Sequence, residues 1–283
     1  MAVLPNWEVL AATKMKIGCA SITWGDKFID CIKEVGPLGY RGVQLRGNAY
    51  NQYKDKVKVL NEILKVNRMN VPIMSSGNVS LDPLNQKSDF ERHMANAKWV
   101  KSIGGKYMQI TFDGRPNATG IQSKEDCQRA AMLGTEIGKG SADLGIRTLH
   151  HNHMGHLGQM PEEVKMIHDA ADRKHMGLLL DVAHYAQGGG SPEKDIAEYG
   201  SLLELVHLKD LIDTAPNEKG KSNYQFVELG KGKVNLDGVL AALAKIGFAG
   251  WAMVELDAVP RPGDTPLSCA TTSANFLKAK NIL

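Results

Sequence analysis

The sequence predicts an α/β fold in which eight parallel strands, each followed by a helix, close into a single (β/α)8 barrel. Short apolar runs alternate with longer amphipathic stretches from one end of the 283 residues to the other. Eight such apolar runs occur, which is enough to close a barrel. The alternative is an open doubly wound sheet, but no G-x-G-x-x-G motif follows the first run, and this favours the barrel.

The eight predicted strands are bounded by glycine, polar residues or the end of an amphipathic stretch. They cover residues 16–24, 41–45, 71–77, 106–112, 146–152, 176–184, 204–210 and 251–257. Helix ends lead through glycine into strands in LGYRGVQL, LGIRTLHH and IGFAGWAMVEL. Strands that alternate with helices in this way favour parallel pairing with right-handed crossovers.

Four of the intervening stretches have the apolar period of a helix, and they cover residues 26–39, 56–69, 123–145 and 235–250. We expect Asp26 to cap the first of them. Ser123, with Asp126 three residues later, resembles a capping box for the third. Gly247 stands where a helix would end before the last strand.

The whole chain, residues 1–283, is expected to form one domain, with residues 1–14 as an extension before the barrel. Residues 211–233 form the longest segment without a periodic pattern, and they are polar and rich in glycine. We expect this segment to be an irregular active-site loop over the barrel mouth, because loops at that face build active sites.

Composition excludes several classes of function. The net charge is only +3, and no basic stripe interleaved with aromatic residues occurs, so nucleic acid is not an expected partner. No apolar run is long enough to span a membrane. The first 15 residues lack a signal-peptide core, so we expect a cytoplasmic protein, although the sequence leaves open whether a leader was removed. A homo-oligomer is also left open.

The four cysteines are scattered along the chain, and none belongs to a C-x-x-C pair. Such a pattern disfavours a thiolate zinc site or a redox motif. We expect all four to be small buried apolar side chains in a reducing compartment.

Side chains that bind divalent metals follow the last four predicted strands, which end in HHNHMGH, DVAH, HLKD and VELD. Asp181, His207 and Glu255 each stand at the end of an apolar run, where a polar group is costly unless it is paired or binds a metal. Their alternative interpretations are a helix cap, a satisfied core histidine or an ion pair. In a strand, His151 and His153 share one face.

The first three predicted strands end mostly in neutral side chains, including those of Ser75 and Ser76. Trp24 and Gln44 stand at these ends, and Arg46 follows the second strand. We expect Trp24, Gln44 and Arg46 to bind a substrate on the side of the mouth opposite the metal.

The last four strand ends, together with GKGKVNLDGVLAALAKIGFAGWAMVELD, resemble the xylose-isomerase-like TIM barrels. This family includes sugar-phosphate isomerases and epimerases and the inosose dehydratases, and the resemblance covers nearly the whole chain. It implies one divalent ion, Mn, Co, Mg or Zn, held by four successive strands. Asp181, His207 and Glu255 match the last three ligand positions, and His151 stands where the epimerases carry glutamate.

The resemblance also assigns roles around the metal. It implies that His184 contacts the substrate. It carries HLKD over as His207, Lys209 and Asp210, and Lys209 could then neutralise an oxyanion. A salt bridge with Asp210 is the competing interpretation of Lys209. The run HHNHMG is similar to the histidine-rich segment of the inosose dehydratases.

These residues together predict proton abstraction next to a carbonyl of a sugar or keto-polyol, with the metal as a Lewis acid. His153 or His184 would act as acid or base, and Glu255 could add a role as base to its role as ligand. Because imidazole replaces one carboxylate, dehydration or aldose–ketose isomerisation fits better than symmetric two-base epimerisation. The protein would then be a metal-dependent enzyme of the isomerase or lyase class.

Three other functions remain open at this point. The same enolate chemistry could cleave a 3-keto-glycoside. Metal-assisted hydrolysis, as in endonuclease-IV-like relatives, would need more ligands and a basic face, which the sequence lacks. A non-catalytic sugar-binding barrel is the third.

Overall fold

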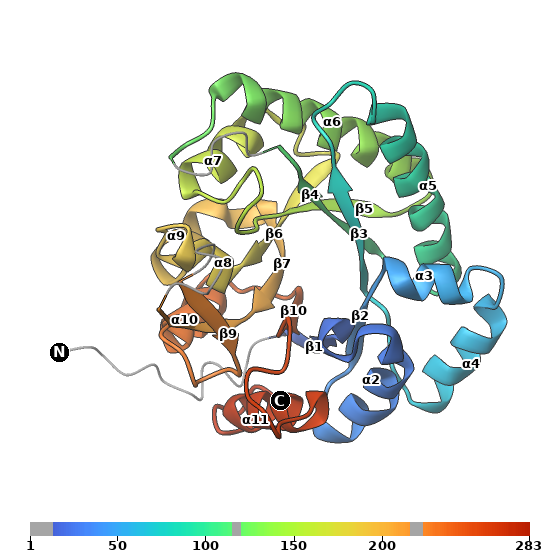
Figure 1. Ribbon diagram of the computed structural model, residues 1–283, viewed down its shortest axis with the longest axis vertical. Helices are drawn as coiled ribbons and strands as arrows, with labels where there is room; N and C mark the ends of the chain where they lie inside the picture. The colour runs from blue at the N-terminus through green and yellow to red at the C-terminus, as the bar shows by residue number, and fades with distance from the viewer. Residues whose placement is uncertain (1–13, 115–119, 216–222) are drawn as a thin grey trace.

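The predicted strands form a closed parallel barrel in the computed structural model, which describes residues 14–114, 120–215 and 223–283 (Figure 1). Around the barrel the strands follow the order β1-β10-β7-β6-β5-β4-β3-β2. They are β1 (Lys16–Ala20), β2 (Gly42–Arg46), β3 (Ile73–Val79), β4 (Tyr107–Phe112), β5 (Arg147–His151), β6 (Met176–Asp181), β7 (Leu203–Leu208) and β10 (Trp251–Val254). Each strand is parallel to both neighbours, so all eight carboxyl ends meet at one face, the barrel mouth.

Helices surround this barrel on the outside (Figure 1). They are α2 (Phe28–Val35), α3 (Gly47–Tyr53), α4 (Val57–Val66), α5 (Gln86–Ser102), α6 (Lys124–Asp143), α7 (Pro161–Ala170), α8 (Val182–Gln187), α9 (Pro192–Tyr199), α10 (Leu236–Lys245) and α11 (Pro266–Lys278). Three short 3-10 helices join them: η1 (Ser21–Lys27), η2 (Gly36–Leu38) and η3 (Gly200–Leu202). In the described ranges, no helix combines the length and the apolar character that a membrane crossing requires.

Two of the three predicted helix boundaries are confirmed. Ser123 caps α6 by accepting from the backbone N–H of Asp126, and its hydroxyl donates to the Asp126 carboxylate. Gly247 follows α10 with a φ of +66°, a conformation that favours glycine. The expected cap at Asp26 is wrong: α2 begins at Phe28, and Asp26 lies inside η1. Strand β1 is correspondingly shorter than predicted, since residues 21–24 wind into η1.

A layer of apolar side chains fills the barrel beneath its mouth. It consists of Ile73, Leu149, Leu179, Leu205 and Met253, all fully buried. Each of them lies two residues before a polar residue on its chain, namely Ser75, His151, Asp181, His207 and Glu255. Because side chains repeat every second residue along a strand, this apolar floor aims all five polar residues into the mouth.

The segment of residues 211–233 is not the irregular loop that the sequence predicts. Strands β8 (Asp210–Asp213) and β9 (Tyr224–Val227) form an antiparallel hairpin within it. Residues 216–222, which separate the two strands in the sequence, lie outside the described residues, as do residues 1–13 of the predicted extension. The hairpin stands beside the mouth and contributes Phe226 to it, with its ring 4.9 Å from the ring of His184.

Candidate metal centre at the barrel mouth

Four side chains from neighbouring strands converge at the mouth as the sequence predicts. His151, Asp181 and His207 end or nearly end β5, β6 and β7, and Glu255 directly follows β10. One possible ligand atom from each lies within 4.8 Å of every other. Asp181 Oδ2 is 3.6 Å from His151 Nε2 and 3.5 Å from His207 Nδ1, and His207 Nδ1 is 3.4 Å from Glu255 Oε1.

Three of these ligand atoms are buried without a hydrogen-bond partner: His151 Nε2, Asp181 Oδ2 and His207 Nδ1. An unpaired buried polar atom costs about 1–3 kcal/mol, so three that point at one another call for a common partner. Two imidazole nitrogens and two carboxylate oxygens are ligands for a divalent ion such as Zn²⁺, Co²⁺ or Mn²⁺. The donor set therefore fits a single divalent metal.

The charges of the centre compensate one another. Burial alone would raise the pKa of Asp181, but His184 and Lys209 hold it well below its usual range. Burial likewise works against ionised Glu255, yet His207 and Lys209 keep its pKa well below the ordinary value. For His207, burial lowers the pKa, while Glu255 and Asp181 outweigh it and raise the pKa to about 9. A metal would compete with the proton that this raised pKa places on His207.

Lys209 is a fully buried cation next to the four ligands. Its Nζ lies 2.6 Å from Asp257 Oδ1 and 3.1 Å from Glu255 Oε1, and it sits 4.1 Å from the centre of the Phe226 ring. Burial opposes its charge, but the surrounding carboxylates raise its pKa above the ordinary value.

The expected alternative for this lysine, a salt bridge with Asp210, is wrong. The Asp210 carboxylate instead accepts backbone N–H groups of Gly230, Gly232 and Val234, so it anchors the GKGK loop.

Two glutamines connect the two histidines of the cluster. His207 Nε2 lies 2.8 Å from Gln44 Oε1, and Gln44 Nε2 donates to Gln109 Oε1 at 2.9 Å. Gln109 Nε2 in turn lies 3.1 Å from His151 Nδ1. These contacts fix both imidazole rings with their remaining nitrogens turned toward Asp181.

His153 and His184 stack on each other beside the centre, with ring centroids 3.8 Å apart. His153 Nδ1 lies 2.7 Å from the carbonyl oxygen of Met154, which can only accept, so Nδ1 carries the proton and Nε2 has a free lone pair. The N–H of Met154 donates to His184 Nδ1, and the Lys209 ammonium lies 3.3 Å from His184 Nε2. Both ring nitrogens of His184 therefore face hydrogen-bond donors, whereas His153 Nε2 does not.

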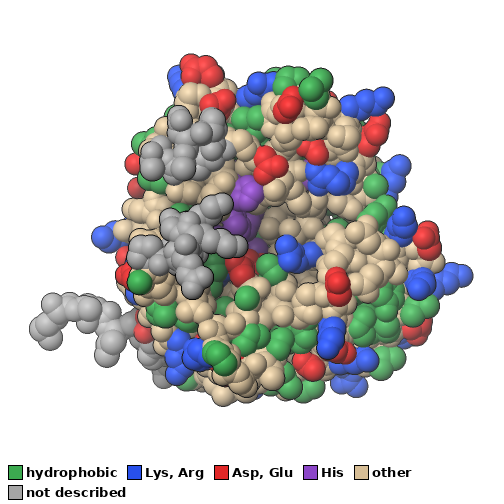
Figure 2. Space-filling model, viewed as in Figure 1, with side chains coloured by type: hydrophobic (Ala, Val, Ile, Leu, Met, Phe, Trp, Pro, Cys, Tyr) green, Lys and Arg blue, Asp and Glu red, His purple; other side chains and the backbone are tan. Residues whose placement is uncertain are grey.

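A hollow of about 310 Å³ opens above the centre, and histidine side chains are visible at its base in Figure 2. It is lined by Ile22, Gln44, Arg46, Ser75, Gly77, Asn78, Gln109, Thr111, His151, His153, His156, Glu255 and Asp257. Of the predicted substrate contacts, Gln44 and Arg46 line it, but Trp24 and His184 do not. Trp24 is in the core, where its Nε1 donates to Glu34.

Ser75 and Ser76, which follow each other on β3, have different surroundings. Ser75 lines the hollow. Ser76 is turned to the helix side, where its Oγ lies 2.6 Å from His93 Nδ1 and accepts from Asn96 Nδ2. This buried polar cluster belongs to the packing between β3 and α5, and it does not reach the mouth.

Three residues of the site have no part in the sequence interpretation: Gln109, Asp257 and Phe226. Gln109 carries a signal in the sequence, because Tyr107, Gln109 and Thr111 alternate with apolar side chains along β4 and so share one face of the strand. Asp257 stands in the VELD motif two residues after Glu255. Phe226 lies in a segment that looks irregular by pattern, so nothing in the sequence indicates its contact with Lys209.

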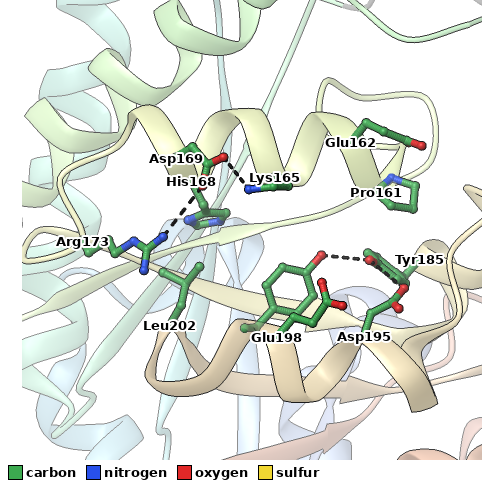
Figure 3. Close-up of a pocket in the computed structure, with 11 residues that line it drawn as sticks. Pro161, Glu162, Lys165, His168, Asp169, Arg173, Tyr185, Asp195, Glu198 and Leu202 are labelled. Carbon is green, nitrogen blue, oxygen red and sulfur yellow. Dashed lines mark hydrogen bonds and ion pairs between the residues drawn. The ribbon is translucent and has the colours of Figure 1, made fainter.

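A second cavity of about 280 Å³ lies outside the barrel between α7 and α9 (Figure 3). Its charged side chains are largely paired: Lys165 Nζ is 2.6 Å from Asp169 Oδ2, and the Tyr185 hydroxyl donates to Asp195 at 3.1 Å. One atom of its described lining, His168 Nδ1, is buried without a hydrogen-bond partner, whereas three such atoms converge at the mouth.

Comparison with known proteins agrees with the barrel fold. The xylose isomerase-like TIM barrel family matches residues 32–279. The chain belongs to this family.

Curated relatives extend over almost the whole chain. An inosose dehydratase of Clostridium botulinum (strain Alaska E43 / Type E3) is 25% identical over 299 residues, covering 94% of this chain and 97% of the relative. Identity at this level leaves the reaction of this chain to be argued from its own site.

Solved structures share the fold. The probable 3-DHS dehydratase AsbF of Bacillus anthracis superposes with a TM-score of 0.75 at 16% identity, covering 93% of this chain and 99% of that one. A structure described as IOLI protein with a binding zinc atom superposes with a TM-score of 0.72 at 18% identity, covering 95% and 98%. At these identities the likeness shows the fold alone.

Proposed function

We propose that this chain is a divalent-metal-dependent enzyme that dehydrates a keto-polyol or a similar sugar, beginning with proton abstraction next to a carbonyl. The observation that carries the proposal is the composition of the centre. A histidine, His151, occupies the β5 position beside Asp181, His207 and Glu255, so that strand supplies no carboxylate as a second base. Elimination of water needs one base and one acid, whereas symmetric epimerisation needs a base on each face of the carbon.

His151, Asp181, His207 and Glu255 would hold the metal, and Mn, Co, Mg and Zn are the candidates, with the two imidazoles favouring Zn, Co or Mn over Mg. When bound, such an ion supplies Lewis-acid stabilisation of the negative charge that develops on the carbonyl side of the substrate. Gln44 and Gln109 orient the two histidine ligands through hydrogen bonds to their other ring nitrogens.

His153 is the proposed base. Its Nε2 lone pair is free, its ring lines the hollow, and its other nitrogen is fixed by the Met154 carbonyl. Burial, with the nearby His151 and Lys209, lowers its pKa to about 3, so the ring is neutral at physiological pH. Both ring nitrogens of His184 already face donors, the N–H of Met154 and the Lys209 ammonium, so His184 serves in this proposal to support His153 by stacking.

The elimination balances with this one imidazole. The C–H bond next to the carbonyl breaks and its proton moves to His153 Nε2, while the electron pair becomes the new C=C bond. The C–O bond to the neighbouring hydroxyl then breaks, and the strongly acidic imidazolium returns the proton so that water leaves. The ion pairs of Lys209 with Glu255 and Asp257 hold these charged groups in place during the reaction.

On the opposite side of the hollow, Arg46 is the proposed contact for substrate oxygens. It is exposed at the end of β2, lines the hollow, and has no side-chain hydrogen bond or ion pair with any residue in the described ranges. A guanidinium with free donors suits carboxylate, hydroxyl or carbonyl oxygens.

Two wider predictions stay with the proposal. The four cysteines are free and buried, which supports the reducing environment of the cytoplasm. One domain over the whole chain and a homo-oligomer both remain predictions for size measurements in solution.

The test is a substrate screen of inososes, ketohexoses and 3-keto-glycosides in heavy water with added Mn²⁺, read by NMR after the metal has been chelated. We expect loss of water and a new C=C signal from a keto-polyol, and we expect His153→Gln to abolish it by about 10²–10⁴-fold while metal binding is kept. Deuterium exchange without loss of water would instead favour an isomerase, and cleavage of the glycosides would favour a lyase. Binding without any exchange would favour a non-catalytic sugar-binding barrel and contradict the proposal.

A further inference from the structure

Gln44 and Gln109 form a two-glutamine bridge between His207 and His151, and the donors and acceptors of this bridge do not suit two metal-binding histidines. Its four groups are His207, Gln44, Gln109 and His151, and each is at least 94% buried. A primary amide donates through nitrogen and accepts through oxygen, so a chain of two amides receives a proton at one end and donates one at the other. Turning both amides together reverses the direction of the chain but cannot give it two accepting ends.

Ligation by both histidines requires two accepting ends. A neutral imidazole that binds a metal through one nitrogen carries its proton on the other, and that N–H needs an acceptor. His207 faces the centre through Nδ1, and its Nε2 meets Gln44 Oε1, an acceptor, so this end of the bridge suits a ligand. His151 faces the centre through Nε2, but its Nδ1 meets Gln109 Nε2, a donor.

We propose that Gln109 turns its side-chain amide when both histidines bind the metal, and that this turn creates a paired N–H donor site for one substrate oxygen. After the turn, Gln109 Oε1 accepts from His151 Nδ1. In this structure Gln44 Nε2 donates to Gln109 Oε1 at 2.9 Å. After the turn, the NH2 group of Gln109 would take the place of that oxygen and face Gln44 Nε2.

Two NH2 groups that face each other repel unless an oxygen accepts from both. The side chains of Gln44 and Gln109 both line the hollow above the centre, so an oxygen that enters the hollow can reach them. A hydroxyl or carbonyl oxygen of a polyol has the lone pairs that this pair of donors needs. Gln109 is the glutamine that turns, because the contact between Gln44 and His207 already has the polarity that ligation requires.

The first test uses the unmodified protein with its histidines labelled with ¹⁵N. We expect His151 to carry its proton on Nε2 in protein stripped of metal and on Nδ1 after one equivalent of Zn²⁺, with its signals assigned by their loss in His151→Gln. His207 should have a proton on Nε2 both before and after zinc is added. A proton on His151 Nδ1 before zinc is added would overturn the proposal.

The second test measures metal affinity by competition with a chelator. Gln109→Glu places an oxygen toward both His151 and Gln44, which removes the mismatch, so we expect Zn²⁺ to bind about 10-fold more tightly. Gln109→Leu removes the acceptor, and we expect about 10-fold weaker binding. Asn78→Asp adds the same charge at the rim of the hollow without reaching His151, and it should change the affinity less than about 3-fold.

If Asn78→Asp raised the affinity for Zn²⁺ as much as Gln109→Glu does, the effect would be due to charge and the proposal would be overturned. Weaker Zn²⁺ binding in Gln109→Glu would also overturn it. Circular dichroism of each variant establishes that it is folded.

The substrate arm rests on the proposed function, whereas both metal tests stand without it. Gln109→Glu removes one of the two N–H donors, so KM for the substrate found in the screen should rise about 10-fold although the metal binds more tightly. A loss of general structure would weaken metal and substrate together, so the opposite signs distinguish the proposed role. An unchanged KM in Gln109→Glu would overturn the donor site and leave the amide turn to be judged by the metal tests.

Discussion

The two halves of the barrel mouth are built from different kinds of side chain. Strands β5, β6, β7 and β10 deliver buried charged or ionisable groups, among them Asp181, His207, Lys209 and Glu255. Strands β2, β3 and β4 deliver neutral amides and hydroxyls to the same hollow, with Gln44 and Gln109 the most buried. Arg46, the cation on this neutral half, is exposed at the rim.

The difference shows how the free-energy cost of burying a charged centre is reduced. Each charge in the late half lies within about 4 Å of an opposite one, which offsets its loss of hydration. The neutral half holds the ligand rings by hydrogen bonds and adds no further charge that would need a partner. Substitutions on the half formed by β5, β6, β7 and β10 should therefore strongly affect metal affinity and folding stability. Substitutions on the half formed by β2, β3 and β4 should act mainly on substrate binding.

The largest effect is expected for Asp181→Asn. Asparagine keeps an oxygen for the N–H groups of Ala183 and His184 that Asp181 Oδ1 accepts, but it removes the carboxylate charge at the centre. We expect metal affinity to fall by more than about 100-fold and activity to be lost with it, as measured by metal analysis and by the NMR assay. Full metal occupancy in both this variant and Glu255→Ala would refute the centre.

Lys209→Met should destabilise the fold by about 3–5 kcal/mol in urea unfolding of the metal-stripped protein, because it leaves buried carboxylates without their cation. The matched control is Lys233→Met, since Lys233 pairs with Asp213 at the surface, where both side chains are about half exposed or more. We expect that control to cost less than about 1 kcal/mol. Equal losses in the two variants would mean that burial does not distinguish the two halves.

His93, on α5 behind β3, should make the stability of the fold depend on pH, with an effect of intermediate size. Burial, with the nearby Arg92, lowers its pKa to about 4, so the unfolded chain takes up a proton before the folded protein does. Stability is complete above about pH 6.5 and declines as the pH falls from there toward 4.

Between pH 7 and pH 5, His93→Gln should lose about 2 kcal/mol less unfolding free energy than the parent protein, because the other histidines titrate in both. Identical losses would show that His93 does not carry this proton linkage.

The smallest effect is expected for Arg46→Met. This side chain is exposed and unpaired among the described residues, so unfolding free energy should change by less than about 0.5 kcal/mol. KM should rise about 10-fold while metal affinity stays constant. A change in metal affinity, or no change in KM, would contradict the division of the mouth into a metal half and a substrate half.

Much of the fold could be predicted because apolar runs and amphipathic stretches alternate along the chain. All eight barrel strands are confirmed, as are the cap at Ser123 and the glycine after α10. The errors fall where local pattern is weak. Residues 21–24 are apolar enough to extend a strand but form part of η1. The hairpin of β8 and β9 lies in a polar, glycine-rich segment that has no strand-like pattern.

The candidate site divides in the same way. His151, Asp181, His207 and Glu255 could be proposed from the sequence because each follows an apolar residue by two positions at the end of a strand. Gln109 and Phe226 could not, because their roles depend on neighbours in space. Gln109 contacts Gln44 on β2, and Phe226 contacts Lys209, which directly follows β7. Trp24 looks equally suited to the mouth in the sequence, but η1 turns it into the core.

The sequence by itself determined the barrel and the four candidate metal ligands, since strand periodicity and chain order place alternate residues at one face. Only the tertiary structure decided how the protons are arranged there. Whether an imidazole donates or accepts depends on the atom packed against it, and Gln109, Met154 and Lys209 reach the histidines from different elements. The chemistry of the mouth therefore depends on contacts that no local pattern encodes.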